Sequence, residues 1–217
     1  MELKRFKIKK FFLLIKVSPK LGFISILKVL IYRLGIKSGF LKLISPIEIC
    51  PIPELFIKDK NYHKIYTVNQ NLINKCIYSA DIYLEGKACF FFKDNYEICS
   101  PPNWFFDYVN KTYFQNNKVH WSECNAFTGS DIKNGWELSR WKWSTTFARA
   151  WRLTGNKKYL DILESWTKSW CMENPCNSGI NWFCGQEISI RLIHAIQTWQ
   201  ILDYPINIPE TSRKRIK

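Results

Sequence analysis

The sequence lacks the residue spacings of a zinc site. None of its 8 cysteines forms a C-x-x-C pair, and its 3 histidines, His63, His120 and His194, lie far apart along the 217 residues. Structural zinc sites draw their ligands from closely spaced Cys and His, so a zinc-finger reading is excluded and we expect neither a metal nor a cofactor. The thiols are expected to pack as small apolar residues, although Cys171 and Cys176 flank an expected turn and could bridge in an oxidising compartment.

Long apolar runs are also missing. A membrane span needs ~18 to 20 apolar residues, whereas the run Phe11–Ile15 is short and Leu21–Tyr32 is interrupted by Lys28. The N-terminus has a basic start and an apolar stretch, but no small-residue cleavage site of the kind that ends a signal peptide. These absences by themselves predict a cytoplasmic chain.

Acidic residues are scarce in the first 45 positions. That stretch holds 11 Lys/Arg and only Glu2, so it carries most of the net charge of +14. Such an arm attracts nucleic acid, anionic lipid or an anionic polysaccharide alike, and no motif of a nucleic-acid-binding fold accompanies it. We therefore expect no nucleic acid as partner and treat peripheral membrane contact through residues 1–45 as open.

Residues 1–45 carry apolar residues at helical spacing and predict two short helices separated near Ser18 and Pro19. The apolar faces of these helices either dock on the rest of the protein or lie on a membrane surface. Residues 46–130 predict an irregular connector with short strands, such as Leu55–Ile57 and Ala88–Phe92, and an aromatic loop after Pro102.

Residues 131–217 have the strongest helical pattern. Ser130 or Asp131 caps a first expected helix that runs to Gly155; a second begins near Asn156 and ends before Pro175. A third runs from about Gln186 to Leu202. Short links between long helices predict antiparallel hairpins and a mainly α fold.

Tryptophan is concentrated in this helical region: 8 of the 10 lie between Trp136 and Trp199. Each buried indole N–H needs a partner, so we expect some of these rings to face a ligand instead. Two charged pairs lie among them at helical spacing, Glu137 with Arg140 and Glu187 with Arg191. They are either solvated ion pairs or, because indoles stack on sugar rings and Arg binds carboxylate or sulfate, parts of a saccharide site.

The same region resembles the N-terminal domain of the heparinase II/III family, bacterial polysaccharide lyases and relatives often encoded with surface-polysaccharide genes. The resemblance covers residues 85–204 and rests on an ordered series of short motifs: Asp131-Ile132-Lys133, Trp136-Glu137-Leu138-Ser139-Arg140, Leu153-Thr154-Gly155, Lys158-Tyr159, Ser169-Trp170, Glu173-Asn174-Pro175, Gly179-Ile180-Asn181-Trp182, Gly185-Gln186-Glu187 and Arg191. Each motif alone is weak, whereas their order and spacing are specific.

The resemblance implies an α/α toroid of antiparallel helical hairpins, here incomplete, with a C-terminal β-sandwich as the missing partner domain. It implies β-elimination on a uronate-containing, anionic polysaccharide, in the periplasm or outside the cell. The substrate-binding residues expected from it are Trp136, Glu137, Arg140, Asn181, Trp182, Glu187 and Arg191. Glu187 and Arg191 could instead brace neighbouring hairpins.

The family's catalytic groups are an Asn-Asn-His segment and a Tyr later in the toroid, and a His in the sandwich, and these motifs do not occur here. No catalytic residue is therefore assigned. The expected function is the substrate-binding part of a lyase-like protein; the alternative is a non-catalytic glycan-binding or assembly protein of surface-polysaccharide production.

We expect the purified chain to show no lyase turnover on heparan sulfate, alginate or other uronate polymers. Removal of the weakly acidic C5 proton needs a positioned base and a neutralised carboxylate, and the groups that supply them in the family are missing. The measurement is the ultraviolet absorbance of unsaturated uronate product; a steady rise above a heat-denatured control would contradict the expectation.

Overall fold

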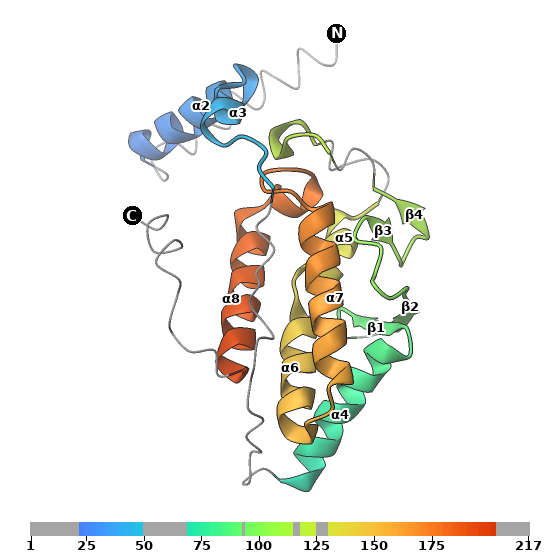
Figure 1. Cartoon of the computed structure of the whole chain (residues 1–217). Coiled ribbons are helices and arrows are strands. Elements are labelled where there is room, and N and C mark those ends of the chain that lie inside the picture. The colour runs from blue at the N-terminus through green and yellow to red at the C-terminus, as the bar shows by residue number, and fades with distance from the viewer. Residues whose placement is uncertain (1–21, 50–68, 93, 115–117, 125–129, 203–217) are drawn as a thin grey trace. The chain divides into compact units, whose positions relative to one another are not determined.

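The computed structural model describes residues 22–49, 69–92, 94–114, 118–124 and 130–202 (Figure 1). The chain is mainly helical, which confirms the predicted class. It divides into two compact units at Pro46, so that the described residues from Ile47 onward belong to one unit with the helical hairpins.

The first unit contains α2 (Phe23–Lys37) and α3 (Phe40–Ile44). Gly39 separates the two helices with a φ of 73°, a left-handed conformation that suits glycine. A helix was expected in this part of the chain and is confirmed. The other expected N-terminal helix, with the break near Ser18 and Pro19, lies outside the described residues.

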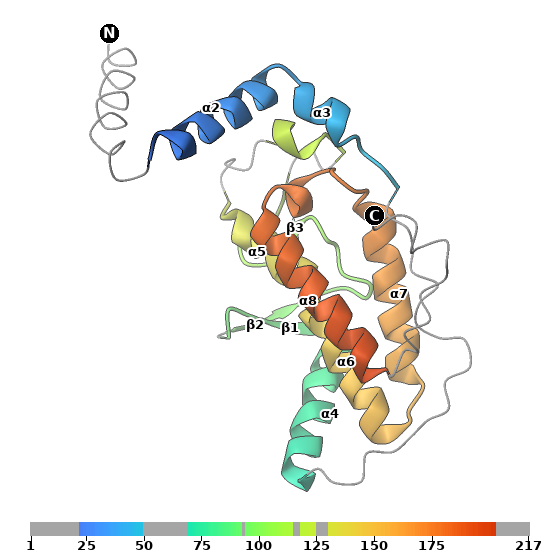
Figure 2. The ribbon, with the colours of Figure 1, turned by 90° about the vertical axis from the view of Figure 1, so that its left-hand side faces the viewer.

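Five helices form the frame of the second unit: α4 (Gln70–Leu84), α5 (Ile132–Ser139), α6 (Lys142–Thr154), α7 (Lys158–Glu173) and α8 (Gly185–Ile201). Helix α6 packs against α4, α7 and α8, as the two views show (Figures 1 and 2). Gly155, with a φ of 68°, ends α6, and a short link leads into α7. The predicted second and third helices are therefore confirmed as α7 and α8.

Short strands and 3-10 turns complete this unit. Strand β1 (Lys87–Phe90) pairs antiparallel with β2 (Asp94–Glu97), and β3 (Phe106–Asp107) pairs antiparallel with β4 (Thr112–Tyr113). The turns are η1 (Trp121–Glu123) and η2 (Ile180–Trp182). The strand predicted at Ala88–Phe92 is present but ends at Phe90, while the one predicted at Leu55–Ile57 lies outside the described residues.

Helix α4 is a correction to the predicted irregular connector. The side chain of Asn69 accepts a hydrogen bond from the Asn71 N–H at 2.8 Å and so caps the helix start. Ala80 is the one residue of α4 that is buried, so the sequence carries only a weak apolar stripe. Helix α4 is stabilised by packing against α6, which is distant in sequence. Local periodicity therefore did not reveal this helix.

The single helix predicted from Asp131 to Gly155 is two helices, α5 and α6. Asp131 does cap the start, since its side chain accepts from the Lys133 N–H at 3.0 Å. The chain breaks at Trp141, whose φ of 64° is left-handed. Trp141 is buried, with its ring 5.3 Å edge-on from that of Trp170, and this packing holds the unfavourable backbone conformation in place.

Most of the clustered tryptophans belong to the core, so the expectation that some of these rings face a ligand now concerns the two that are half-buried, Trp182 and Trp199. Six of the eight between Trp136 and Trp199 are at most 9% exposed. Four of these six indole groups have acceptors inside the protein: Ile180 O for Trp136, Leu138 O for Trp143, Ser100 Oγ for Trp166 and Ser139 Oγ for Trp170. A core can therefore hold this many indoles when serine hydroxyls and helix-end carbonyls accept from them.

A buried carboxylate ties β3 to α5. Asp107 is fully buried and accepts from the Asn134 side chain at 3.0 Å and from the Asn110 side chain at 2.8 Å. Burial alone would raise the pKa of Asp107, but these bonds and those from the backbone of Asn110 and Val109 outweigh it and lower that pKa. The carboxylate thus stays ionised and fully hydrogen-bonded in the core.

Gly135 of α5 marks the closest approach between this helix and its neighbours. A Cβ at this position would lie 2.6 Å from the Phe114 ring and 2.9 Å from the Ile180 side chain. Both neighbours are buried, so neither can move without disturbing the core. The contact requires glycine for its size.

We expect Gly135→Ala to lower the free energy of unfolding by about 1–3 kcal/mol relative to Gly185→Ala, because overpacking a buried contact forces shifts of this energy. Gly185 begins α8, and a Cβ there meets nothing within 4 Å. Alanine raises helix propensity more inside α5 than at the first residue of α8, so the difference between the two variants is a lower bound on the cost of overpacking. Urea denaturation measures it; equal midpoints for the two variants would contradict the close-packed contact.

Candidate functional site

The guanidinium of Arg140 joins α5 to α8. It donates to Glu187 through Nε at 2.7 Å and through Nη2 at 2.8 Å, a bidentate pair, and through Nη1 to Glu137. The hydrogen bond with Glu187 contributes most to raising the pKa of Arg140, so the guanidinium keeps its charge. The predicted pair of Glu137 with Arg140 is confirmed. The partner that the structure gives Glu187 is Arg140, the residue that follows α5.

Arg191 of α8 is directed at backbone carbonyls and aromatic rings. Its Nη2 donates to Asn181 O at 2.7 Å and its Nε to Ser139 O at 3.2 Å. The guanidinium carbon lies 4.3 Å from the centroid of the Trp170 ring and 5.4 Å from that of Trp182. These contacts match the bracing role that the sequence left open for Arg191.

The turn before α8 is held by amide and indole groups. Asn181 is fully buried and donates from Nδ2 to Asn174 Oδ1 at 2.8 Å, while the indole of Trp182 donates to Asn174 O at 3.3 Å. Gly179 enters the turn with a φ of 73°. His194 of α8 contacts the carbonyl of Arg140 through Nδ1, which joins the turn, α8 and the end of α5 into one network.

All seven predicted binding residues therefore belong to one region, but they differ in access to solvent. Four of them are buried: Trp136, Asn181, Glu187 and Arg191. Glu137, Arg140 and Trp182 are half-buried, and the side chain of Arg140 keeps 25% of its surface exposed. Only these three offer surface to a ligand in the described structure, and ligand contacts by any of the seven remain a prediction.

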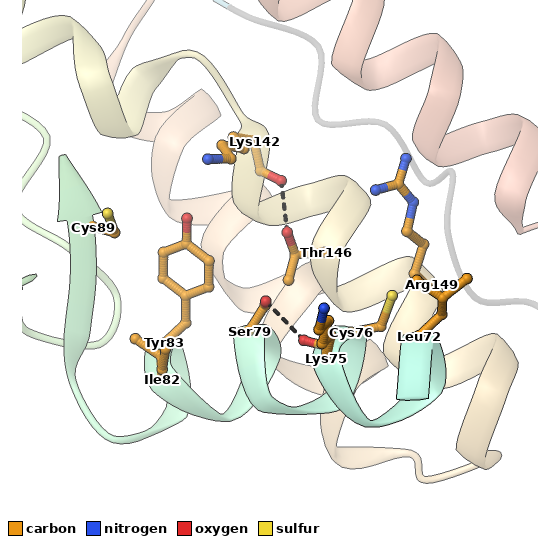
Figure 3. A pocket seen from close by; sticks show the side chains of 10 residues that line it. All are labelled: Leu72, Lys75, Cys76, Ser79, Ile82, Tyr83, Cys89, Lys142, Thr146 and Arg149. Carbon is orange, nitrogen blue, oxygen red and sulfur yellow. Dashed lines mark hydrogen bonds between the residues drawn. The ribbon is translucent and has the colours of Figure 1, made fainter. Parts of the chain in front are cut away.

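A second feature, which the sequence reasoning missed, is a groove of about 320 Å³ between α4 and α6 (Figure 3). Three cationic side chains line it, Lys75, Lys142 and Arg149, and its lining contains no carboxylate. Lys142 and Cys89 lie toward one end, and Arg149 and Leu72 toward the other. Groups arranged in this way favour an elongated anion over a neutral ligand.

Polar groups also lie along this groove. Burial raises the pKa of Tyr83, so its phenol stays protonated and can donate a hydrogen bond. The Thr146 hydroxyl donates to Lys142 O and the Ser79 hydroxyl to Lys75 O, which leaves both hydroxyl oxygens able to accept (Figure 3). A ligand carrying both charge and hydroxyl groups would find partners of both kinds.

One signal of the groove was present in the sequence. Lys142, Thr146 and Arg149 are four and three residues apart and so share a face of α6. Lys75 lies in the segment that the sequence predicts to be an irregular connector, so the sequence pattern does not place it beside these three residues. In the described ranges no three metal-binding side chains lie together as a candidate metal site.

Comparisons of the chain with protein-family models, with curated proteins and with solved structures found no match. The family resemblance of the motifs therefore remains a prediction.

We expect Arg140→Ala to lower the free energy of unfolding by about 3–5 kcal/mol, because it leaves the buried carboxylate of Glu187 without its cation. Lys157→Ala is the matched control: its 3.9 Å pair with Asp161 is exposed, and the expected loss is below about 0.5 kcal/mol. Chemical denaturation measures both. Similar losses in the two variants would show that the Arg140 network does not brace α5 and α8.

Proposed function

We propose that this chain is the glycan-binding, helical part of a heparinase II/III-like polysaccharide lyase. One observation carries the proposal: motif residues separated by up to about 50 positions meet in one network. Trp136 bonds to Ile180, Arg140 to Glu187, and Arg191 to Asn181. A substrate-binding region built from these motifs requires such a convergence.

The arrangement of the helices supports the same proposal. Helix α7 follows α6 through a short link, and α8 packs along α6 as well (Figures 1 and 2). Successive helical hairpins packed side by side are the unit from which an α/α toroid is built. In the proposed protein these helices form one arc of such a toroid.

The proposed ligand is an anionic, uronate-containing polysaccharide. The groove between α4 and α6 supplies three cations and hydroxyl-bonding groups, and its volume is at the lower end of that of ligand sites. Arg140, Glu137 and Trp182 add a half-buried charged and aromatic margin at the junction of α5 and α8. Arginine and lysine bind carboxylate and sulfate groups, and an indole stacks on a sugar ring.

The role proposed for the described residues is binding and positioning. In a lyase-like protein, β-elimination would take place on groups that this sequence does not contain, and no described residue is given a catalytic role. A glycan-binding or assembly protein without turnover is the second candidate. The groove favours this second candidate, because its cationic lining can bind an anion without any catalytic group.

We expect the triple variant Lys75→Gln/Lys142→Gln/Arg149→Gln to bind polyuronates or heparan sulfate at least about tenfold more weakly than the parent, a loss of roughly 1.4 kcal/mol. The control is Lys133→Gln/Lys157→Gln/Lys168→Gln, which removes three exposed cations outside the groove. Isothermal titration calorimetry at ~0.15 M salt measures both, with an expected change below about threefold for the control.

Equal losses in the two triple variants would show that binding follows net charge and not the groove. A parent protein that binds none of the polyuronates or sulfated glycans would overturn the proposed function. Binding together with a release of unsaturated product would contradict the binding-only role and would assign turnover to this chain.

A further inference from the structure

The first unit exposes an apolar stripe along α2. Six large apolar residues follow one another at helical spacing on one face: Phe23, Ile24, Leu27, Leu30, Ile31 and Leu34. Their exposed fractions run from 45% for Leu27 to 75% for Phe23, and neither α2 nor α3 has a buried residue. Contiguous apolar surface of this kind is unfavourable in water and marks a place where something else binds.

Cations flank this stripe on both sides. At about 100° per residue, Lys28, Arg33 and Lys37 lie roughly 80–120° from the centre of the stripe, Lys28 on one side and the other two on the opposite side. Lys42 of α3 adds a fourth cation, and the sequence has no Asp or Glu from residue 22 to 46. Long basic side chains in such flanking positions can keep their charges in water while the apolar stripe is buried.

The exposed apolar stripe and the flanking cations together limit the class of partner that can bind this unit. A nucleic acid would satisfy the cations but would leave the apolar stripe in water. An apolar protein surface would cover the stripe but would not explain a segment with only cationic charges. The surface of an anionic lipid bilayer satisfies both, because acyl chains accept the apolar face and headgroup phosphates accept the cations.

The length of α2 decides how it would meet the bilayer. Its 15 residues extend about 22 Å, less than the ~30 Å hydrocarbon core. Among the described helices none combines the length and the apolarity needed to cross a membrane. We propose that residues 22–46 are an anionic-lipid-binding element, with α2 lying in the plane of the bilayer surface and its six-residue stripe among the acyl chains.

This element is independent of the glycan groove, since it uses other residues in another unit. It would hold the second unit near a membrane. The sequence before it is also basic, with seven Lys/Arg against Glu2 in residues 1–21, and adds to the same electrostatic attraction.

The test is co-sedimentation of the full chain with vesicles of phosphatidylcholine alone and with about 30% phosphatidylglycerol, at ~0.1 M salt. We expect binding to the anionic vesicles at least about tenfold stronger than to the neutral ones, because each cation near the surface contributes about fivefold. Lys28→Gln/Arg33→Gln/Lys37→Gln should weaken binding to the anionic vesicles at least about tenfold, while the cations of residues 1–21 keep part of the preference. Leu27→Ser/Leu30→Ser/Leu34→Ser should reduce binding to both kinds of vesicle.

The matched control is Leu192→Ser/Ile193→Ser/Ile196→Ser, which changes three exposed apolar residues of α8 and should leave vesicle binding unaltered. Parent protein that does not bind anionic vesicles, or a stripe variant that binds as the parent does, would overturn the proposal. If the stripe variant instead lowers the melting temperature or dissociates a dimer while the parent ignores vesicles, protein covers the stripe. Retention by DNA without vesicle binding would assign the arm to nucleic acid.

Discussion

The junction of α5 and α6 at Ser139–Trp141 is the constraint on which the helical unit depends. The left-handed turn at Trp141 ends one helix and begins the next, so backbone carbonyls of the junction are freed from the helical pattern. Ser139 O accepts from Arg191, and Arg140 O contacts His194. Residues distant in sequence thus bind to carbonyl groups at the end of α5. In an unbroken helix these carbonyls would be hydrogen-bonded within the helix.

The same junction carries the charged centre of the unit. Arg140 follows directly after α5, and from there its guanidinium group donates to both Glu137 and the buried Glu187. A buried ion pair gains little over apolar packing, yet removing one partner leaves an uncompensated charge. The network therefore fixes the positions of α5 and α8 more than it adds to the free energy of unfolding. Only its half-buried residues are accessible to a ligand.

The two units have different surface chemistry, and a different anion is proposed for each. In the second unit, cations line a groove that also contains hydroxyl-bonding groups, which suits a hydroxylated polymer. In the first, cations flank an exposed apolar stripe, which suits a lipid surface. A single figure for net charge cannot distinguish these cases, because the neighbours of each cation decide what it can bind.

Part of the fold and of the candidate site could be predicted from the sequence. The caps at Asp131 and Gly155, the helices α7 and α8, and the pairing of Glu137 with Arg140 follow from short-range rules of spacing and backbone conformation. Local chemistry is sufficient for such features because their partners lie within a few residues or on one helical face.

Other features were decided only by tertiary structure. The break at Trp141, the helix α4 and the pairing of Glu187 with Arg140 depend on contacts between segments far apart in the chain. Burial of the tryptophans was equally hidden, because the sequence does not show which serine or carbonyl will accept each indole N–H. Residue types and their local spacing were set by the sequence alone; which faces meet, and hence which side chains remain open to a ligand, depends on packing among distant segments.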